Sequence, residues 1–460
     1  MYTLPKDTVI TNQVINDVID YNERYKGRFE MLERYYLGKH DGIVEREKDG
    51  KLSNNKIIVN HAKYITDTNV AYLLGNPVDY QASDGIEIQP LLDAYKKQTI
   101  NDLDSEIAKD VSIFGLQYEY VYANENAEPK SCEVDNKNTI IVYDDTVEHN
   151  KLFGLIYRPI KKGDVFKYWE VIYVDKKIKR TYKSYSKSLQ QVGKDEPHAF
   201  GDVPLICYKN NPEFMGDFEP VLSLIDAYNL LQSDRINDKE QLVDAILLFY
   251  GVDFNAEDGE ELKESRMLAN IPTDAKVEYL TKALNEGDVD ILRKSIETDI
   301  HKISMVPNMS DVNFVGNSSG VAIRYKLLAF EQNIKNKERY MEKGLMERFK
   351  LYNNFLFTQS KMAEVPVEEV DAVFKRNLPS NDFEISQMIN NLADLVDAET
   401  LLSQLSFIKD ASEIVELKAK EDEEKPKPAF DNAFNNNEIT DANNGENTEE
   451  IEETEENIIS

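Results

Sequence analysis

Two adjoining segments decide the fold of this chain: NMSDVNFVGNSSG at residues 308–320 and VAIRYKLLAFEQNIKNKERYMEKGLMERFKLYNNFLF at residues 321–357. The first holds three Asn, three Ser and two Gly, the composition of a loop. The second repeats apolar residues at steps of three, four and seven, which predicts an amphipathic helix. At 1.5 Å per residue this helix is roughly 55 Å long, enough to cross a whole assembly. Its apolar face comprises Leu327, Phe330, Ile334, Met341, Leu345, Phe349, Tyr352 and Leu356.

A helical hairpin is predicted directly before this loop. Its first helix starts at Asp217, with Pro220 in the first turn, and runs to about Ala245. Two short strands are predicted at 247–254 and 275–280, with an acidic turn between them. A second helix then runs from Asp288 to about Ser304. The β excursion is therefore expected to stand on two helices.

The first 216 residues predict an α+β domain. Helical patterns cover 11–37, about 60–74 and 91–114, and the charged, Gly-containing segment 39–55 reads as a loop. Strands are predicted at 78–80, 118–122, 139–143, 153–157 and 168–174. After the long helix, an extended piece at 372–377 and helices at about 383–396, 399–407 and 411–420 complete the ordered part.

The chain is strongly acidic, with 85 Asp and Glu against 54 Lys and Arg among 460 residues, a net charge of −31. Such a chain is a poor candidate for gripping DNA or an anionic membrane over a broad face. Residues 421–460 hold fourteen acidic residues and two lysines, and this composition predicts a disordered tail. The sequence contains neither a signal-peptide core nor a run of about 20 apolar residues, so we expect a protein made in the cytoplasm, without a membrane span.

Known catalytic and cofactor motifs are absent from the sequence. It has no P-loop, no GxGxxG, no GxSxG and no HExxH, and the two cysteines, Cys132 and Cys207, lack zinc-site spacing. We therefore expect no cofactor and no enzymatic activity. Acidic clusters such as Asp144-Asp145 leave one alternative open, a metal-dependent hydrolase, although solvated turns explain these clusters better. A second alternative is an intracellular scaffold protein that does not handle DNA.

Several short runs, in order and spacing, carry a resemblance to a known family. They are YYLGKH (35–40), NNKIIVN (54–60), YLLGNP (72–77), Phe114-Gly115 before YEY (118–120), and NSSGVA (317–322). With these runs the chain resembles the portal, or head-to-tail connector, proteins of tailed double-stranded DNA bacteriophages, of the type found in long-tailed (siphovirus) phages of Gram-positive hosts. The resemblance extends to about residue 420, and none of the runs is catalytic.

The resemblance implies a mostly helical α+β portal fold with wing, stem, clip and crown, assembled into a ring around a channel. Matched by segment, it implies the following parts: 1–216 wing, 217–246 stem helix, 247–285 clip, 286–305 stem helix, 306–320 tunnel loop, 321–382 long helix and wing return strand, 383–420 crown helices, and 421–460 acidic tail.

The same resemblance implies function and partners. About twelve subunits would form a ring at one capsid vertex of the virion, after assembly in the host cytoplasm. Double-stranded DNA would pass through the channel in packaging and ejection. Terminase, then the head-tail adaptor, and the major capsid and scaffolding proteins would be its partners, and the ring would nucleate the procapsid. The exact subunit number is left open, because rings of eleven to thirteen differ by only a few degrees at each interface.

Candidate site residues follow from these assignments. The tunnel loop at the constriction would comprise Asn308, Met309, Ser310, Asp311, Val312, Asn313, Phe314, Val315, Gly316, Asn317, Ser318, Ser319 and Gly320. Possible stem contacts with DNA are Arg293, Lys294 and Lys302, and the clip partner surface would contain Asn255, Glu257, Asp258, Glu260 and Glu261. A plain helix-to-helix connection remains the alternative for the loop, and intersubunit ion pairs for the three cations. The net negative charge of the folded body fits a conduit through which DNA slides, because it repels phosphate and keeps contacts transient.

Overall fold

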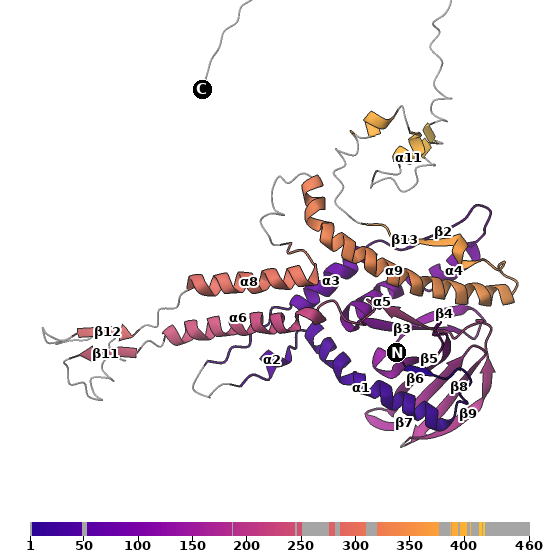
Figure 1. The fold of residues 1–460 in the computed structure, drawn as a ribbon, viewed down its shortest axis with the longest axis horizontal. Coiled ribbons are helices and arrows are strands. Elements are labelled where there is room, and N and C mark those ends of the chain that lie inside the picture. The colour runs from indigo at the N-terminus through magenta and orange to yellow at the C-terminus, as the bar shows by residue number, and fades with distance from the viewer. Residues whose placement is uncertain are drawn as a thin grey trace, which may run out of the picture. The chain divides into compact units, whose positions relative to one another are not determined.

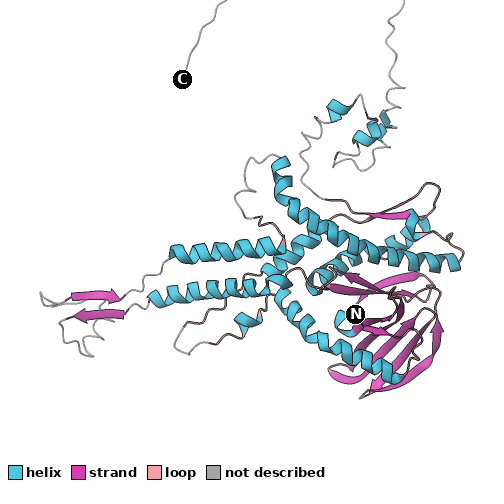
Figure 2. Cartoon of the chain, viewed as in Figure 1, coloured by secondary structure: helices cyan, strands magenta, loops and turns pink. Residues whose placement is uncertain are grey.

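The computed structural model describes residues 2–47, 53–185, 187–243, 246–250, 276–280, 286–309 and 320–376, with short pieces between 387 and 418. The chain divides into two compact units, Met1–Leu378 and Pro379–Ser460. The first mixes helices and sheets (Figures 1 and 2), which confirms the α+β class. In the second unit the structure describes the short helix α11 (Ala398–Leu402).

The described helices of the first unit are α1 (Asn12–Tyr36), α2 (Asp41–Val44), α3 (His61–Leu74), α4 (Gln89–Lys96), α5 (Ile100–Phe114), α6 (Leu222–Val243), α8 (Glu286–Ser304) and α9 (Gly320–Thr358). The strands are β1 (Tyr2–Leu4), β2 (Asp79–Ala82), β3 (Leu116–Ala123), β4 (Pro129–Val134), β5 (Thr139–Asp144), β6 (Lys151–Lys162), β7 (Val165–Asp175), β8 (Ile178–Tyr185), β9 (Ser188–Pro197), β10 (Leu205–Lys209), β11 (Ile246–Tyr250), β12 (Lys276–Leu280) and β13 (Val370–Val373).

One six-stranded sheet, in the order β1-β5-β6-β7-β8-β9, packs against α1. The strand β1 pairs with β5 in parallel, and the remaining neighbours are antiparallel. Helix α1 is capped by Thr11, whose hydroxyl accepts a hydrogen bond from the Val14 amide at 3.4 Å. Its buried residues Ile15 and Val18 pack on strand residues that include Phe153 and Leu155, so the amphipathic pattern seen in the sequence faces this sheet.

The long helix α9 joins two apolar cores. Its first half, with Phe330 and Ile334, packs among residues of α3, α6 and α8. Its second half, with Leu345 and Phe349, packs among residues of α4, α5 and β10. Two smaller sheets adjoin this second core, β10-β3-β4 and the antiparallel pair β13-β2. The single apolar face read from the sequence is therefore buried along most of its length.

Helices α6 and α8 contact each other, and β11 and β12 form an antiparallel pair between them in the sequence (Figure 1). Several large apolar side chains on the two helices are exposed to solvent in the single chain, among them Leu230 at 41%, Ile291 at 69% and Leu292 at 50%. The predicted hairpin with a small β excursion is confirmed for these described elements.

The structure corrects four details of the secondary structure. The single helix predicted at 91–114 is two helices, α4 and α5, separated at Thr99, which has a left-handed φ of 49°. The segment 39–55 contains the short helix α2 rather than only loop. The first hairpin helix begins at Leu222 rather than Asp217, after a turn of 3-10 helix at Glu219–Val221. Strands β1, β4, β8, β9 and β10 were not predicted.

Candidate functional site

The predicted loop starts where α8 ends, and its first residues are tied to two helices. The Tyr64 hydroxyl, on α3, donates to the Pro307 carbonyl at 2.8 Å and accepts from the Met309 amide at 3.2 Å. The Asn308 side-chain amide donates to Glu297 Oε1, on α8, at 3.0 Å. Of the loop residues named from the sequence, the structure describes Asn308, Met309 and Gly320, and 310–319 lie outside the described residues.

Between α8 and the loop lie Met305 and the two residues that follow it. Helix α8 ends at Ser304, and Met305 adopts a left-handed φ of 57°. Val306 is then buried, with 1% of its surface exposed. The His301 ring nitrogen Nδ1 lies 3.0 Å from the Val306 carbonyl, so the protonated Nδ1 donates a hydrogen bond there. The entry to the loop is thus built from specific contacts.

Two of the three cations predicted from the sequence to contact DNA, Arg293 and Lys294, form ion pairs within their own chain. The Arg293 guanidinium donates to Asp290 at 3.1 Å and to Glu297 Oε2 at 2.7 Å, and it lies 3.4 Å from the Tyr228 hydroxyl. These contacts, with Tyr228 the largest cause, raise the pKa of Arg293 above its usual value. Lys294 pairs with Asp290 at 2.7 Å, and Lys302 is exposed on α8.

Histidine rings pack where α3, α6 and α8 meet. The rings of His61 and His301 are 5.9 Å apart, and His61 also makes an edge contact with Tyr228 at 4.8 Å. Burial, followed by the proximity of His301, lowers the pKa of His61 to about 4. His61 is therefore neutral at neutral pH and behaves as an apolar packing residue at the base of the hairpin.

Buried charges attach α9 to the body at two positions on either side of its middle. Lys337 contacts Asp217, and its ammonium donates to Asn210 at 2.6 Å. The same Asp217 accepts hydrogen bonds from Asn69 at 2.8 Å and Ser112 at 2.6 Å, so this carboxylate links α9 to α3 and α5.

Further along α9, Arg348 is fully buried between Glu119 and Asp104. Its guanidinium donates to Glu119 at 2.8 and 3.0 Å, and to Asp104 at 2.5 Å. The Tyr208 hydroxyl donates to the same Glu119 at 2.6 Å. A third contact, from Arg376 to Glu331 and Glu338, ties the chain after β13 to the first half of α9. These contacts therefore attach α9 to the rest of the fold at several points along its length.

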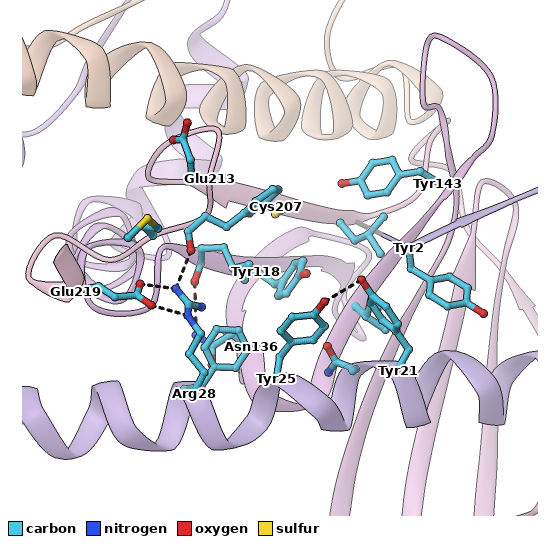
Figure 3. A pocket seen from close by; sticks show the side chains of 17 residues that line it. Tyr2, Tyr21, Tyr25, Arg28, Tyr118, Asn136, Tyr143, Cys207, Glu213 and Glu219 are labelled. Carbon is cyan, nitrogen blue, oxygen red and sulfur yellow. Dashed lines mark hydrogen bonds and ion pairs between the residues drawn. The ribbon is translucent and has the colours of Figure 1, made fainter. Parts of the chain in front are cut away.

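A cavity of about 470 Å³ lies between α1 and strands β3, β5 and β10 (Figure 3). Tyrosine rings gather around it, including Tyr25 and Tyr118, and its one basic residue among those the structure describes is Arg28. Arg28 already donates to both carboxylate oxygens of Glu219, at 2.7 and 2.5 Å, and to two backbone carbonyls. Because Arg28 is already engaged in these contacts, the cavity is poorly suited to binding a phosphate group.

The residues predicted for the clip partner surface, Asn255, Glu257, Asp258, Glu260 and Glu261, lie outside the described residues. Within the part of the chain that the structure describes, no three His, Cys, Asp or Glu side chains gather in a way suited to a metal ion. No helix in that part has the length and apolar character needed to cross a bilayer.

Sequence reasoning missed Tyr64, Glu297 and His301 as partners of the loop entry. The spacing of Arg293 and Glu297, four residues apart on one helix, was a local signal for their ion pair. Tyr64 is 243 residues from Pro307 in sequence, so no local sequence pattern could predict their hydrogen bond.

The chain is similar to known proteins over most of its length. The family model described as phage portal protein, SPP1 Gp6-like, matches residues 15–427. The portal protein of Bacillus phage SPP1 is 25% identical over 430 residues, covering 83% of this chain and 80% of that protein. The portal protein of Clostridium phage phiCD119 is 22% identical over 416 residues, covering 83% and 90%.

Among solved structures, the neck of an empty GTA particle, computed with C6 symmetry, matches with 12% identity and a TM-score of 0.46, covering 78% of this chain and 89% of that one. Because the family model spans most of the sequence, this chain belongs to the SPP1 Gp6-like family of phage portal proteins.

Proposed function

We propose that about twelve copies of this chain form a ring at one vertex of the phage capsid, with double-stranded DNA passing through its centre. The observation that carries the proposal is the family match over residues 15–427. In the ring, α6 and α8 would be the stem and 247–285 the clip, which would dock terminase and then the head-tail adaptor. Residues 1–216 would be the wing, and 383–420 the crown.

We further propose that residues 306–320 form the loop at the constriction of the channel. Three features support this role. The loop entry is fixed to α3 and α8, its exit opens α9, and α9 is anchored in the core by Lys337 and Arg348. The residues on either side of 310–319 are therefore attached to packed helices.

The charge of the chain supports a sliding contact. Without the tail, the body still carries about −19, so phosphate is repelled on average and contacts stay short-lived. Arg293 and Lys294 are partly neutralised by Asp290 and Glu297, which weakens any phosphate contact that they make. Assembly of the procapsid with scaffolding and major capsid proteins would start from the ring.

Electron microscopy of the purified protein, with native mass spectrometry on the same sample, tests the ring. A central hole and a mass of about 635 kDa, twelve times 52.9 kDa, are expected. Purified protein that stays monomeric even with scaffolding and capsid proteins present would contradict it.

Substitutions within 311–316 test the loop. We expect assembled particles that lack DNA for at least some of these variants. Normal DNA content with every substitution would contradict the constriction role.

A further inference from the structure

The chain enters the loop through contacts that come from two different helices. Tyr64 lies on α3, while Glu297 and His301 lie one turn apart on α8. Together they hold three successive positions, Val306 to Asn308, and the amide of the next residue.

We propose that Tyr64, Glu297 and His301 form a loop-entry clamp, a set of positioning residues that fix the direction in which the chain leaves α8 towards the constriction. This inference rests on the proposed function of the loop. None of the three residues needs to touch DNA, because each acts through the backbone or side chain of residues 306–309.

The local backbone explains why a clamp is needed. Pro307 has no amide hydrogen, so its position cannot be held by a backbone N–H donor. The carbonyl of Pro307 and the amide of Met309 are instead both bound by one hydroxyl, that of Tyr64. A single oxygen that both donates and accepts fixes the spacing of two backbone groups two residues apart.

Glu297 adds a link to the stem. Its two carboxylate oxygens have different partners, Asn308 at 3.0 Å through Oε1 and Arg293 at 2.7 Å through Oε2. A displacement of Arg293 on the stem therefore shifts the carboxylate that holds the first loop residue. The clamp thus gives the stem a direct path to the loop entry.

The substitution Tyr64→Phe tests the clamp, because it removes one hydroxyl and keeps the ring. The matched control is Tyr36→Phe, whose hydroxyl donates to Asp67 at 3.0 Å and accepts from Lys63 at 3.1 Å, with no hydrogen bond to residues 306–309. Hydrogen exchange of peptides covering 306–309 is measured on assembled rings, together with ring mass, melting temperature and the DNA content of particles.

We expect Tyr64→Phe to speed exchange at the Met309 amide about tenfold or more and to reduce the fraction of DNA-filled particles, with ring mass and melting temperature matching the control. Asn308→Ala, which breaks the Glu297 contact separately, should reduce DNA filling in the same way.

Unchanged exchange at Met309 overturns the clamp, whatever the particles contain. Faster exchange with normal DNA filling also overturns it, because the contact would then be structural only. If particles built with the unsubstituted chain contain no DNA, the proposed function fails instead, while the exchange measurement still decides whether the hydroxyl holds the loop entry.

Discussion

Replacing Arg348 by Met should destabilise the protein strongly, and in a manner that depends on pH. Arg348 is fully buried, and its guanidinium is the cation between Glu119, also fully buried, and Asp104, with 2% exposed. Methionine fills similar space but leaves two carboxyl groups in the core without a countercharge. Breaking a buried ion pair by removing one partner costs about 3–5 kcal/mol.

The pH dependence follows from Asp104. Burial raises the pKa of Asp104 above its usual value, while the charge of Arg348 and its hydrogen bond oppose this rise. Without Arg348 the pKa rises further, so the folded variant takes up a proton more readily than the unfolded chain. Protonation of Asp104 stabilises the folded variant at low pH, and this stabilisation is lost as the pH rises through the pKa of Asp104 in the folded state. The loss caused by Arg348→Met should therefore be largest near pH 8 and smaller near pH 5.

Urea unfolding of the full chain at pH 8 and pH 5 measures both effects. The control is Lys350→Met, two residues away on α9, where the ammonium pairs with Asp202 at 3.4 Å and is half exposed. Such a surface pair contributes at most about 1 kcal/mol, at either pH. The reasoning is refuted if Arg348→Met costs no more than the control at pH 8, or if its cost is the same at both pH values.

Three further outcomes are expected. Burial and the neighbouring Glu133 raise the pKa of Asp110 to about 7, so its contribution to stability is full below about pH 4 and is lost progressively as the pH rises to about 7. In urea unfolding, Asp110→Asn should therefore be more stable than the parent at pH 8, by an amount on the order of 1 to 4 kcal/mol, and by a smaller amount at pH 5. In the same assay, Gly115→Ala should cost on the order of 3 kcal/mol, because a Cβ there would lie 2.1 Å from the Phe214 carbonyl oxygen. Gly163→Ala, also at positive φ but in open space, should cost about 1 kcal/mol. Equal losses from the two substitutions would contradict the steric argument. Burial raises the pKa of both Cys132 and Cys207 to about 11. Ellman's reagent should therefore react with the folded protein at pH 7.5 roughly a hundredfold more slowly than with the unfolded chain. Rapid labelling of the folded protein would show that these thiols are not shielded.

The elements with a single wide apolar face were readable from the sequence. Helices α1 and α9 have such faces, and residues of both faces are buried in the core, such as Ile15 and Leu32 of α1 and Ile334 and Phe349 of α9. Strand β9 shows why others were missed. Nearly all of its ten residues are exposed apart from Leu189, so it is held by its backbone pairing with β8 rather than by burial of one face.

The candidate site was readable only in part. The polar composition of 308–320 and the cations Arg293 and Lys294 were visible in the sequence. The start of the long helix was predicted at Val321, one residue after its start at Gly320 in the structure. The residues that hold the loop entry could not be predicted from the sequence, because a tyrosine on a helical face predicts packing and does not identify the partner of its hydroxyl. Long-range hydrogen bonds of this kind depend on the tertiary arrangement of α3 and α8.

The pairing of β2 with β13 has a consequence for the order of events during synthesis. Tyr80 lies opposite Ala372, so these partners leave the ribosome almost 300 residues apart. The apolar surfaces of α4 and α5 are covered by Leu345 and Phe349 of α9, which also emerge late. For most of translation, therefore, the nascent chain exposes surface that only its last quarter can cover, and such chains fold slowly and are prone to aggregate until that quarter arrives. Late closure of the core also means that a chain cut short before α9 cannot complete a subunit.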